Sequence, residues 1–176
     1  MELLSGTILG APLALLAGVL ASLASIIVIE RVAPSDACWN HLNDDLAEDI
    51  GHTLVTLIVV GGIVVPATLA GGAVLHGSMG ASPWPVSLPL AIQVLFALLA
   101  AELGPYWVHR LQHRVPLLWR FHSVHHSAPR LCWFNTYRFH FVDLALVTVP
   151  RFGVLVLLGI PHAVAIYYLL FAYVIA

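Results

Sequence analysis

The chain has very little charge and no lysine. Charged residues make up 9% of its 176 residues, whereas they form about a quarter of an ordinary soluble domain. With 60% hydrophobic residues and a mean hydropathy of +0.94, the composition excludes a water-soluble globule. The seven basic residues are all arginines, and nine acids leave a net charge of -2. The chain therefore lacks the basic surface of a nucleic-acid-binding protein.

Redox motifs built from cysteine or glycine are also missing. The two cysteines, Cys38 and Cys132, lie far apart in the sequence. This spacing is typical of ordinary thiols, because it fits neither a disulfide framework nor a cysteine-based metal site. No glycine-rich dinucleotide fingerprint occurs. Any redox chemistry of this chain therefore needs electrons from a separate protein.

Long apolar runs, in contrast, are abundant. A helix needs roughly 20 mostly apolar residues to cross the hydrocarbon core of a membrane. Three runs reach this length: Leu4–Ile29, Thr53–Leu75 and Val86–Val108. The only charged residue within them is Glu102, near one end of the third run. Three such runs in one chain predict a membrane protein rather than a soluble core.

A fourth apolar stretch follows Val142 and is broken at Pro150-Arg151 and again at Gly159–His162. These breaks predict a helical hairpin or a broken span, because proline removes a backbone donor that lipid cannot replace. The predicted fold is all-α, a polytopic integral membrane protein with about 4-5 transmembrane or hairpin helices. Its parts are three spans in residues 1–108 with an acidic loop at 30–51, a histidine-rich segment at 109–141, and the start of a second membrane hairpin at 142–176.

Arginine and histidine gather in one polar segment. Residues 109–140 hold five of the seven arginines and six of the ten histidines. Positively charged loops remain on the cytoplasmic side of a membrane, so we expect this segment to face the cytoplasm. The exclusive use of arginine points to a GC-rich source, and we expect a bacterial inner membrane.

Five histidines within eighteen residues predict a metal site. His109 and His113 are four residues apart, so their imidazoles project from one helix face, one turn apart. His122 precedes both His125 and His126 by about one turn, and the adjacent pair diverges by about 100° around a helix. That divergence suits a two-metal centre. Imidazole binds Zn, Cu, Ni and Fe alike, so the spacing leaves the metal open and argues only against Ca and Mg.

Two further residues join this candidate site. Glu102 is an acid within a predicted span, and we expect it to hydrogen-bond an imidazole and fix its tautomer. The alternative for Glu102 is an acid at a helix end near the lipid headgroups. His140 is either a sixth ligand or an interfacial residue. The other four histidines are isolated and are expected to lie in loops or at the interface: His41, His52, His76 and His162.

The sequence around the clustered histidines resembles the fatty acid hydroxylase superfamily, which includes sterol desaturases and C-4 sterol methyl oxidases. The resemblance rests on three motifs: Glu102-Leu-Gly-Pro-Tyr-Trp-Val-His109-Arg-Leu-Gln-His113, Pro116-Leu-Leu-Trp119-Arg-Phe-His122-Ser-Val-His125-His126-Ser127, and Asn135-Thr-Tyr-Arg138-Phe-His140. It implies a di-iron centre that uses O2 to hydroxylate or desaturate a C–H bond of a lipid. It also implies an external electron donor, such as a reductase, a ferredoxin or a cytochrome.

The resemblance assigns His109 and His113 to the first histidine box of the family, and His122, His125 and His126 to the second. His140 occupies the family's Arg-x-His position. Two features depart from the pattern. Glu102 stands where the family usually has aspartate, and nothing after His140 supplies the family's last histidine box.

From the missing box we expect a chain truncated before it, with weakened metal binding and no hydroxylase activity of its own. Two alternative functions stay open at this point. One is a membrane protein that binds or transports metal through the same cluster, and the other is a non-catalytic fragment. A transporter typically places polar ligands at mid-membrane, whereas this cluster follows the predicted span.

Overall fold

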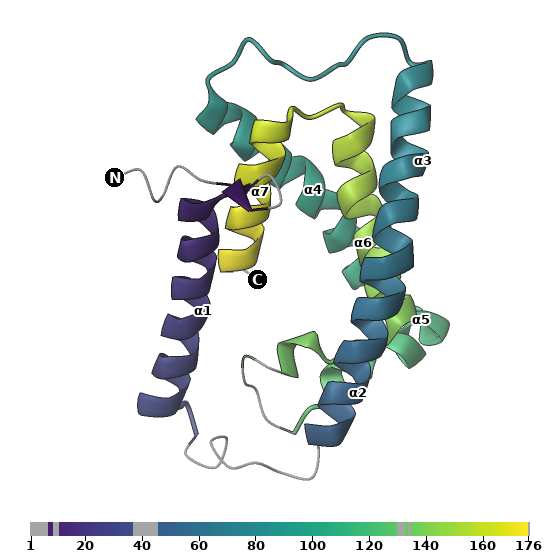
Figure 1. Ribbon diagram of the computed structural model, residues 1–176. Coiled ribbons are helices and arrows are strands. Elements are labelled where there is room, and N and C mark those ends of the chain that lie inside the picture. Colours follow the sequence, from purple (N-terminus) through teal and green to yellow (C-terminus); the bar gives the residue numbers. More distant parts are fainter. Residues whose placement is uncertain (1–6, 9–10, 37–45, 130–132, 134, 176) are drawn as a thin grey trace.

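A computed structural model describes residues 7–8, 11–36, 46–129, 133 and 135–175 of the chain (Figure 1). Cys38, Cys132 and His41 lie outside the described residues. Apart from two short paired strands, the regular structure of the described part is helical, which confirms the all-α prediction. The elements are β1 (Thr7–Ile8), β2 (Ala11–Pro12), α1 (Leu13–Val32), α2 (Leu46–Thr56), η3 (Leu57–Val64), α3 (Val65–Ser78), α4 (Leu90–Gln112), α5 (Pro116–His122), η4 (His125–Ser127), η5 (Asn135–Tyr137), α6 (Phe141–Leu157) and α7 (His162–Ile175).

Two helices of the described part are long and apolar enough to cross a membrane. One is Leu46–Ser78, the continuous 33-residue helix formed by α2, the π-helical η3 and α3, and the other is α4. At about 1.5 Å per residue, the longer helix extends roughly 50 Å, which exceeds the apolar thickness of a bilayer of about 30 Å. Its polar first turn therefore extends beyond the apolar layer if the helix spans it.

The beginning of this long helix lies within the predicted acidic loop at 30–51. Residues 46–51 are helical, and Glu48 and Asp49 lie in the first turn of α2. Acids in a first turn interact favourably with the partial positive charge of the helix N-terminus. Both acids also contact Arg138, which is distant in the sequence. The sequence predicts a solvated loop and a short surface helix through Glu48 in this segment, whereas Asp49 is fully buried beside Arg138.

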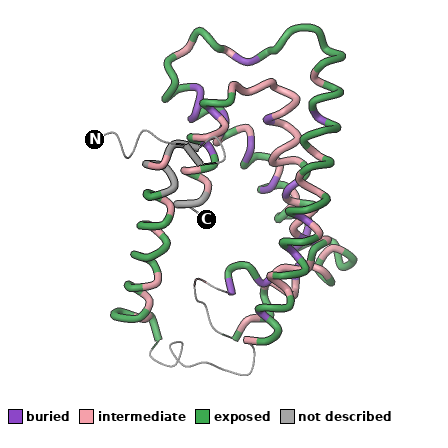
Figure 2. The backbone as a smooth tube through the Cα atoms, in the orientation of Figure 1, coloured by how far each residue is buried: buried purple, intermediate pink, exposed green. Residues whose placement is uncertain are grey.

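The buried core lies where α4 contacts α6 and α7. In the tube of Figure 2, buried positions gather in these helices, whereas α1 is largely exposed. Ala97 and Ala101 on α4 are fully buried, and their small side chains let the neighbouring helices approach closely. Larger side chains complete this core: Val94, Leu155, Val164, Tyr168 and Trp84.

Helix α6 runs through Pro150 without a break, so the predicted interruption at Pro150-Arg151 is wrong. The reason lies on α4, where Gly104 leaves room for the proline ring. A Cβ atom built on Gly104 would lie 2.7 Å from Cβ of Pro150. The two helices thus pack proline against glycine, and the break in the apolar stretch occurs farther along the chain.

The chain reverses between α6 and α7 at Gly159, whose φ of 65° is left-handed and favours glycine. His76 lies beside this turn, with its Nδ1 atom 3.0 Å from the carbonyl oxygen of Leu157. The hydroxyl of Ser82 donates to the carbonyl of Leu158 at 3.1 Å. His76 therefore satisfies a carbonyl at the end of α6, which fits the expectation that it lies apart from the clustered histidines.

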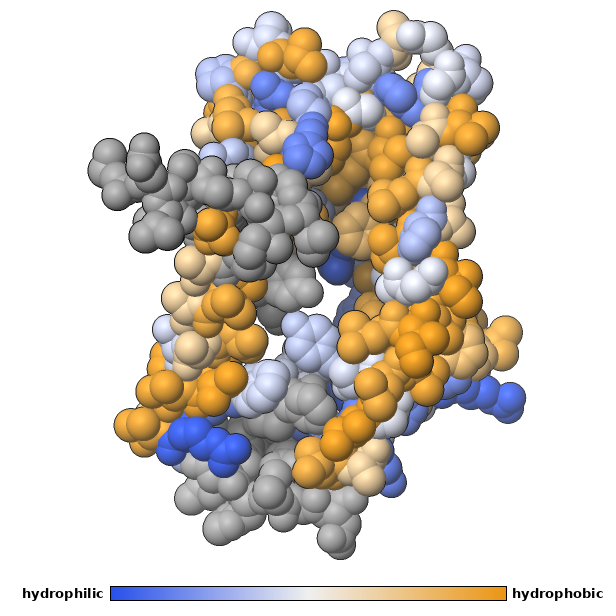
Figure 3. Space-filling model, in the orientation of Figure 1, coloured by the Kyte–Doolittle hydropathy of each residue, from blue (hydrophilic) through white to orange (hydrophobic). Residues whose placement is uncertain are grey.

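The outer surface is strongly apolar. In the space-filling view of Figure 3, apolar colour covers α1 and the long helix of α2, η3 and α3. Several large hydrophobic side chains on these helices are exposed: Val28, Ile29, Ile58, Ile63 and Val74. Such a surface is costly in water and favourable in a bilayer, so it supports membrane association.

Candidate metal centre

Four of the clustered histidines come together where α4, α5 and η4 meet. His109 lies in the last turn of α4, and His113 caps its C-terminal end. Pro116 starts α5 at a position where its missing N–H costs nothing. The chain thereby turns back, and His122 at the end of α5 and His126 in η4 reach the first pair.

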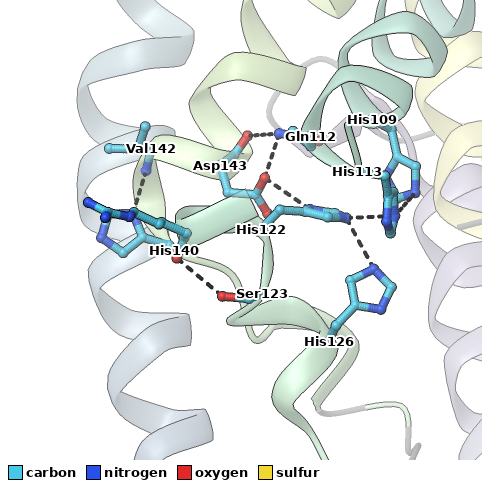
Figure 4. Close-up of polar contacts among 10 residues, drawn as sticks. His109, Gln112, His113, His122, Ser123, His126, His140, Val142 and Asp143 are labelled. Carbon is cyan, nitrogen blue, oxygen red and sulfur yellow. Dashed lines mark hydrogen bonds and ion pairs between the residues drawn. The ribbon is translucent and has the colours of Figure 1, made fainter. Parts of the chain in front are cut away.

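The ring nitrogens of these four residues converge (Figure 4). The Nε2 atom of His113 lies 3.1 Å from that of His109 and 3.3 Å from that of His122. The Nε2 atoms of His122 and His126 are 3.1 Å apart. One ring nitrogen from each of the four residues lies within 4.8 Å of all the others.

This spacing fits ligands of a single metal ion. Ring nitrogens bound about 2.1 Å from one ion lie about 3.0–3.4 Å apart when they are neighbours in its coordination shell. Without a cation or protons between them, converging nitrogen lone pairs repel one another. The donor set is therefore suited to a transition metal, and imidazole alone does not decide which one.

A buried carboxylate lies behind the cluster and orients its central member. The Nδ1 atom of His122 lies 3.1 and 3.2 Å from the two carboxylate oxygens of Asp143, in the first turn of α6. His122 and Asp143 are each 1% exposed. With its Nδ1–H donated to Asp143, His122 directs the lone pair of Nε2 toward the other imidazoles, as metal-binding histidines commonly do.

Gln112 holds the carboxylate from the other side. Its amide nitrogen donates to Oδ1 of Asp143 at 2.5 Å, and the side chain is fully buried. Gln112 is the last residue of α4 and lies between His109 and His113, so one helix end supplies two imidazoles and the donor that fixes the carboxylate partner of His122. Sequence analysis missed both Gln112 and Asp143. The sequence feature that could have indicated Asp143 is its position as a lone acid at the start of the last apolar stretch.

Burial lowers the pKa of His122 to about 4, with further lowering by the neighbouring His109, His126 and His113. His122 is therefore neutral at pH 7, which leaves its Nε2 free of a proton that a metal would have to displace. Burial also lowers the pKa of His125, and the nearby Asp143 carboxylate and the backbone of Arg138 oppose this shift.

This pKa predicts the pH dependence of the metal-free protein. The folded-state pKa of His122 is about 4 against 6.5 for an unperturbed imidazole, so the unfolded chain binds the extra proton first. The contribution of His122 to stability is complete above pH 6.5 and is lost as the pH falls toward 4. We expect the unfolding temperature in detergent to fall more steeply over this window than in His122→Gln. Parallel curves for the two proteins would contradict this account.

The structure places the other predicted site residues around this centre rather than in it. The ring of His125 lies 5.3 Å from that of His126 and stacks on Phe139 at 4.4 Å, and its buried Nδ1 atom has no hydrogen-bond partner. His140 accepts a hydrogen bond at Nδ1 from the backbone N–H of Val142 and caps α6. The Nδ1 atom of His125 is therefore available to a metal ion, whereas one of the two ring nitrogens of His140 already accepts a hydrogen bond.

Glu102 contacts no imidazole within the described residues, although it shares a face of α4 with His109 and His113. Its carboxylate binds Arg151 of α6 at 2.8 Å and accepts a hydrogen bond from the hydroxyl of Tyr168 of α7 at 3.4 Å. Asp143 instead makes the contact with an imidazole that was expected of Glu102.

Comparison with known proteins covers the part of the chain that holds these residues. The fatty acid hydroxylase family profile matches residues 94–176, a range that contains all four converging histidines and Asp143. The matched part of the chain, residues 94–176, belongs to the fatty acid hydroxylase superfamily. A curated relative is the ornithine lipid hydroxylase OlsE of Rhizobium tropici, which is 37% identical over 154 residues, covering 81% of this chain. No solved structure matches the chain.

The match covers 44% of the length of OlsE, so the chain spans less than half of that relative. The family match rests on sequence, and the histidines that carried the resemblance lie within the matched range.

Proposed function

We propose that this protein is a membrane-bound, iron-dependent hydroxylase that acts on a lipid. The observation that carries the proposal is the convergence of four ring nitrogens on one point, with Asp143 fixing the tautomer of His122. Its membership of the fatty acid hydroxylase superfamily gives this cluster a chemical context. The name of OlsE adds that a relative hydroxylates a lipid.

In this proposal His109, His113, His122 and His126 hold one iron ion. His125 serves a second, neighbouring ion, because its buried Nδ1 atom has no partner and the adjacent His126 belongs to the first set. His140 is retained as a further ligand through Nε2. When bound, such a di-iron centre activates O2 for attack on an unactivated C–H bond.

The residues of the chain then bind, orient and hold protons. Asp143 keeps the proton of His122 on Nδ1, and Gln112 keeps Asp143 in place. Glu102 lies roughly 10 Å along α4 from His109, at about 1.5 Å per residue. Paired with Arg151, it connects α4 to α6 on the side that bears His109 and His113. We propose that it supports this side of the site indirectly.

The overall reaction converts a lipid C–H bond, O2, two electrons and two protons into an alcohol and water. The electrons come from an external reductase, ferredoxin or cytochrome, because the sequence has no dinucleotide fingerprint and too few cysteines for an iron–sulfur cluster. We place the protein in a bacterial inner membrane, with the histidine cluster at the cytoplasmic surface.

A substrate reaches this cluster from its open side. His109, His113 and His126 are exposed, whereas His122 closes the opposite side. An apolar cavity of about 710 Å³ also lies between α3, α4 and α6, lined among others by Gly71, Gly104 and Gly153. Gly104 and Trp107 place this cavity on the face of α4 opposite His109. It therefore does not lead directly to the proposed iron site.

Because these 176 residues lack the family's last histidine box, the test expresses them joined to that box from a relative, together with a ferredoxin and its reductase. The lipids of these bacteria are then analysed. We expect lipids heavier by one oxygen atom, whose oxygen derives from 18O2, and no such products with His113→Ala. Isolated protein that binds zinc or copper in preference to iron, with no oxidised lipid in these cells, would instead favour the metal-binding alternative.

A further inference from the structure

A buried arginine connects the long helix formed by α2, η3 and α3 to the segment before α6, beside the metal centre. The guanidinium of Arg138 contacts two consecutive acids in the first turn of α2. Its Nε atom lies 2.7 Å from Oδ1 of Asp49, and one terminal nitrogen lies 2.7 Å from Oε2 of Glu48. Arg138 is 2% exposed and Asp49 is fully buried, so neither charge is screened by solvent. A buried charge that loses its partner is strongly destabilised.

From Arg138 the connection continues directly to a histidine of the second box. The backbone of Arg138 lies close enough to the ring of His125 to raise the pKa of that imidazole. The next residue, Phe139, stacks on His125 with an angle of 5° between the rings. Its carbonyl accepts a hydrogen bond from the hydroxyl of Thr56, at the end of α2, at 3.1 Å. Both ends of α2 thus hold the short segment that orients His125.

A second route leads from the same segment to His122. His140 follows Phe139 and caps the N-terminus of α6 through its Nδ1 atom. Asp143 lies in the first turn of that helix and binds Nδ1 of His122. The position of the Asp143 carboxylate therefore depends on where residues 138–140 anchor α6.

We propose that Asp49, with Glu48 and Thr56, positions the metal centre through Arg138. The family profile begins at residue 94, so these three residues belong to a part of the chain outside the matched family range. The inference rests on the proposed function in that it takes the histidine cluster as an iron site. Asp49 is a positioning residue that acts through Arg138.

The test compares Asp49→Asn with wild type in iron affinity, measured on purified protein in detergent well below the unfolding temperature. The substitution keeps the shape of the side chain but removes the charge that holds Arg138. We expect about tenfold weaker iron binding, the lower end of the effect of outer hydrogen-bond partners on metal affinity. Glu48→Gln should have a smaller effect, since the side chain of Glu48 is 73% exposed.

Gln93→Ala is the matched control for a purely structural effect. Gln93 is buried at the far end of α4 and accepts a hydrogen bond from the Trp84 indole, so its loss destabilises the fold away from the histidines. We expect Gln93→Ala to lower the unfolding temperature and leave iron affinity unchanged. If Asp49→Asn binds iron as wild type does, or if Gln93→Ala weakens binding equally, the inference is overturned.

A second measurement separates this inference from the proposed function. In the metal-free protein, Asp49→Asn should shift the imidazole NMR signals of His122 and His125, whereas Gln93→Ala should not. If His113→Ala loses iron but Asp49→Asn leaves the NMR signals of His122 and His125 unchanged, the positioning role is overturned and the iron site stands. If Asp49→Asn shifts these signals but the wild-type protein binds no iron, the iron site is overturned and the positioning role stands.

Discussion

Replacing His122 by alanine should remove most of the bound iron. His122 is the central member of the cluster, because its Nε2 atom lies within 3.3 Å of the Nε2 atoms of both His113 and His126. The substitution removes a ligand and also leaves Asp143 without its imidazole partner. Loss of an outer hydrogen-bond partner lowers metal affinity about 10–100-fold. We expect the loss of the ligand His122 to lower the iron affinity by more than this. Iron content after dialysis and titration of the metal-free protein measure this loss.

His162→Ala provides the control for this substitution. His162 begins α7 and is exposed, and it is absent from the converging group. It should retain full iron content. Equal iron content in His122→Ala and wild type would show that the four converging nitrogens do not bind the metal.

Asp143→Ala is expected to weaken both the fold and the iron site. It leaves the buried Nδ1–H of His122 without an acceptor, and it leaves the buried Gln112 amide with only the 3.5 Å contact to the backbone carbonyl of residue 143. At about 1–3 kcal/mol for a buried unpaired group, the free energy of unfolding falls by at least about 1–3 kcal/mol. The iron affinity falls about 10–100-fold, because the tautomer of His122 is no longer fixed.

Asp143→Asn separates the two effects. The asparagine keeps an oxygen acceptor for His122, and the Gln112 amide can rotate because its own oxygen has no hydrogen-bond partner. We expect the asparagine variant to retain most of the stability and more iron than the alanine variant. Denaturant titrations and iron titrations of the two variants measure these differences. Identical losses in both variants would show that the acceptor oxygen is unimportant.

The histidine cluster could be predicted from the sequence because it is nearly local. His109 and His113 are fixed relative to each other by one helical turn, and Pro116 marks where the chain turns toward His122. Asp143 could not be predicted in the same way. It reaches His122 only because α6 packs against α4 and α5, a contact between residues 21 apart that no local pattern encodes.

Long-range pairing also explains the other missed features. The sequence patterns placed Asp49 in a solvated loop, since an acid beside an apolar run usually faces water. Its partner, Arg138, lies 89 residues later. In the same way, Pro150 was expected to break a helix, and the glycine that accommodates it lies on another helix. In each case the deciding contact joins segments that are distant in the sequence.

The four converging imidazoles come from only eighteen consecutive residues, and this has a consequence for biosynthesis. The entropic cost of closing such a short loop is small and grows only slowly with loop length. The ligand set therefore can assemble once α4, α5 and η4 have left the ribosome, before α6 emerges from it. Asp143 arrives afterwards, so an early metal-binding unit has low contact order, and the later helix converts it into a fixed site.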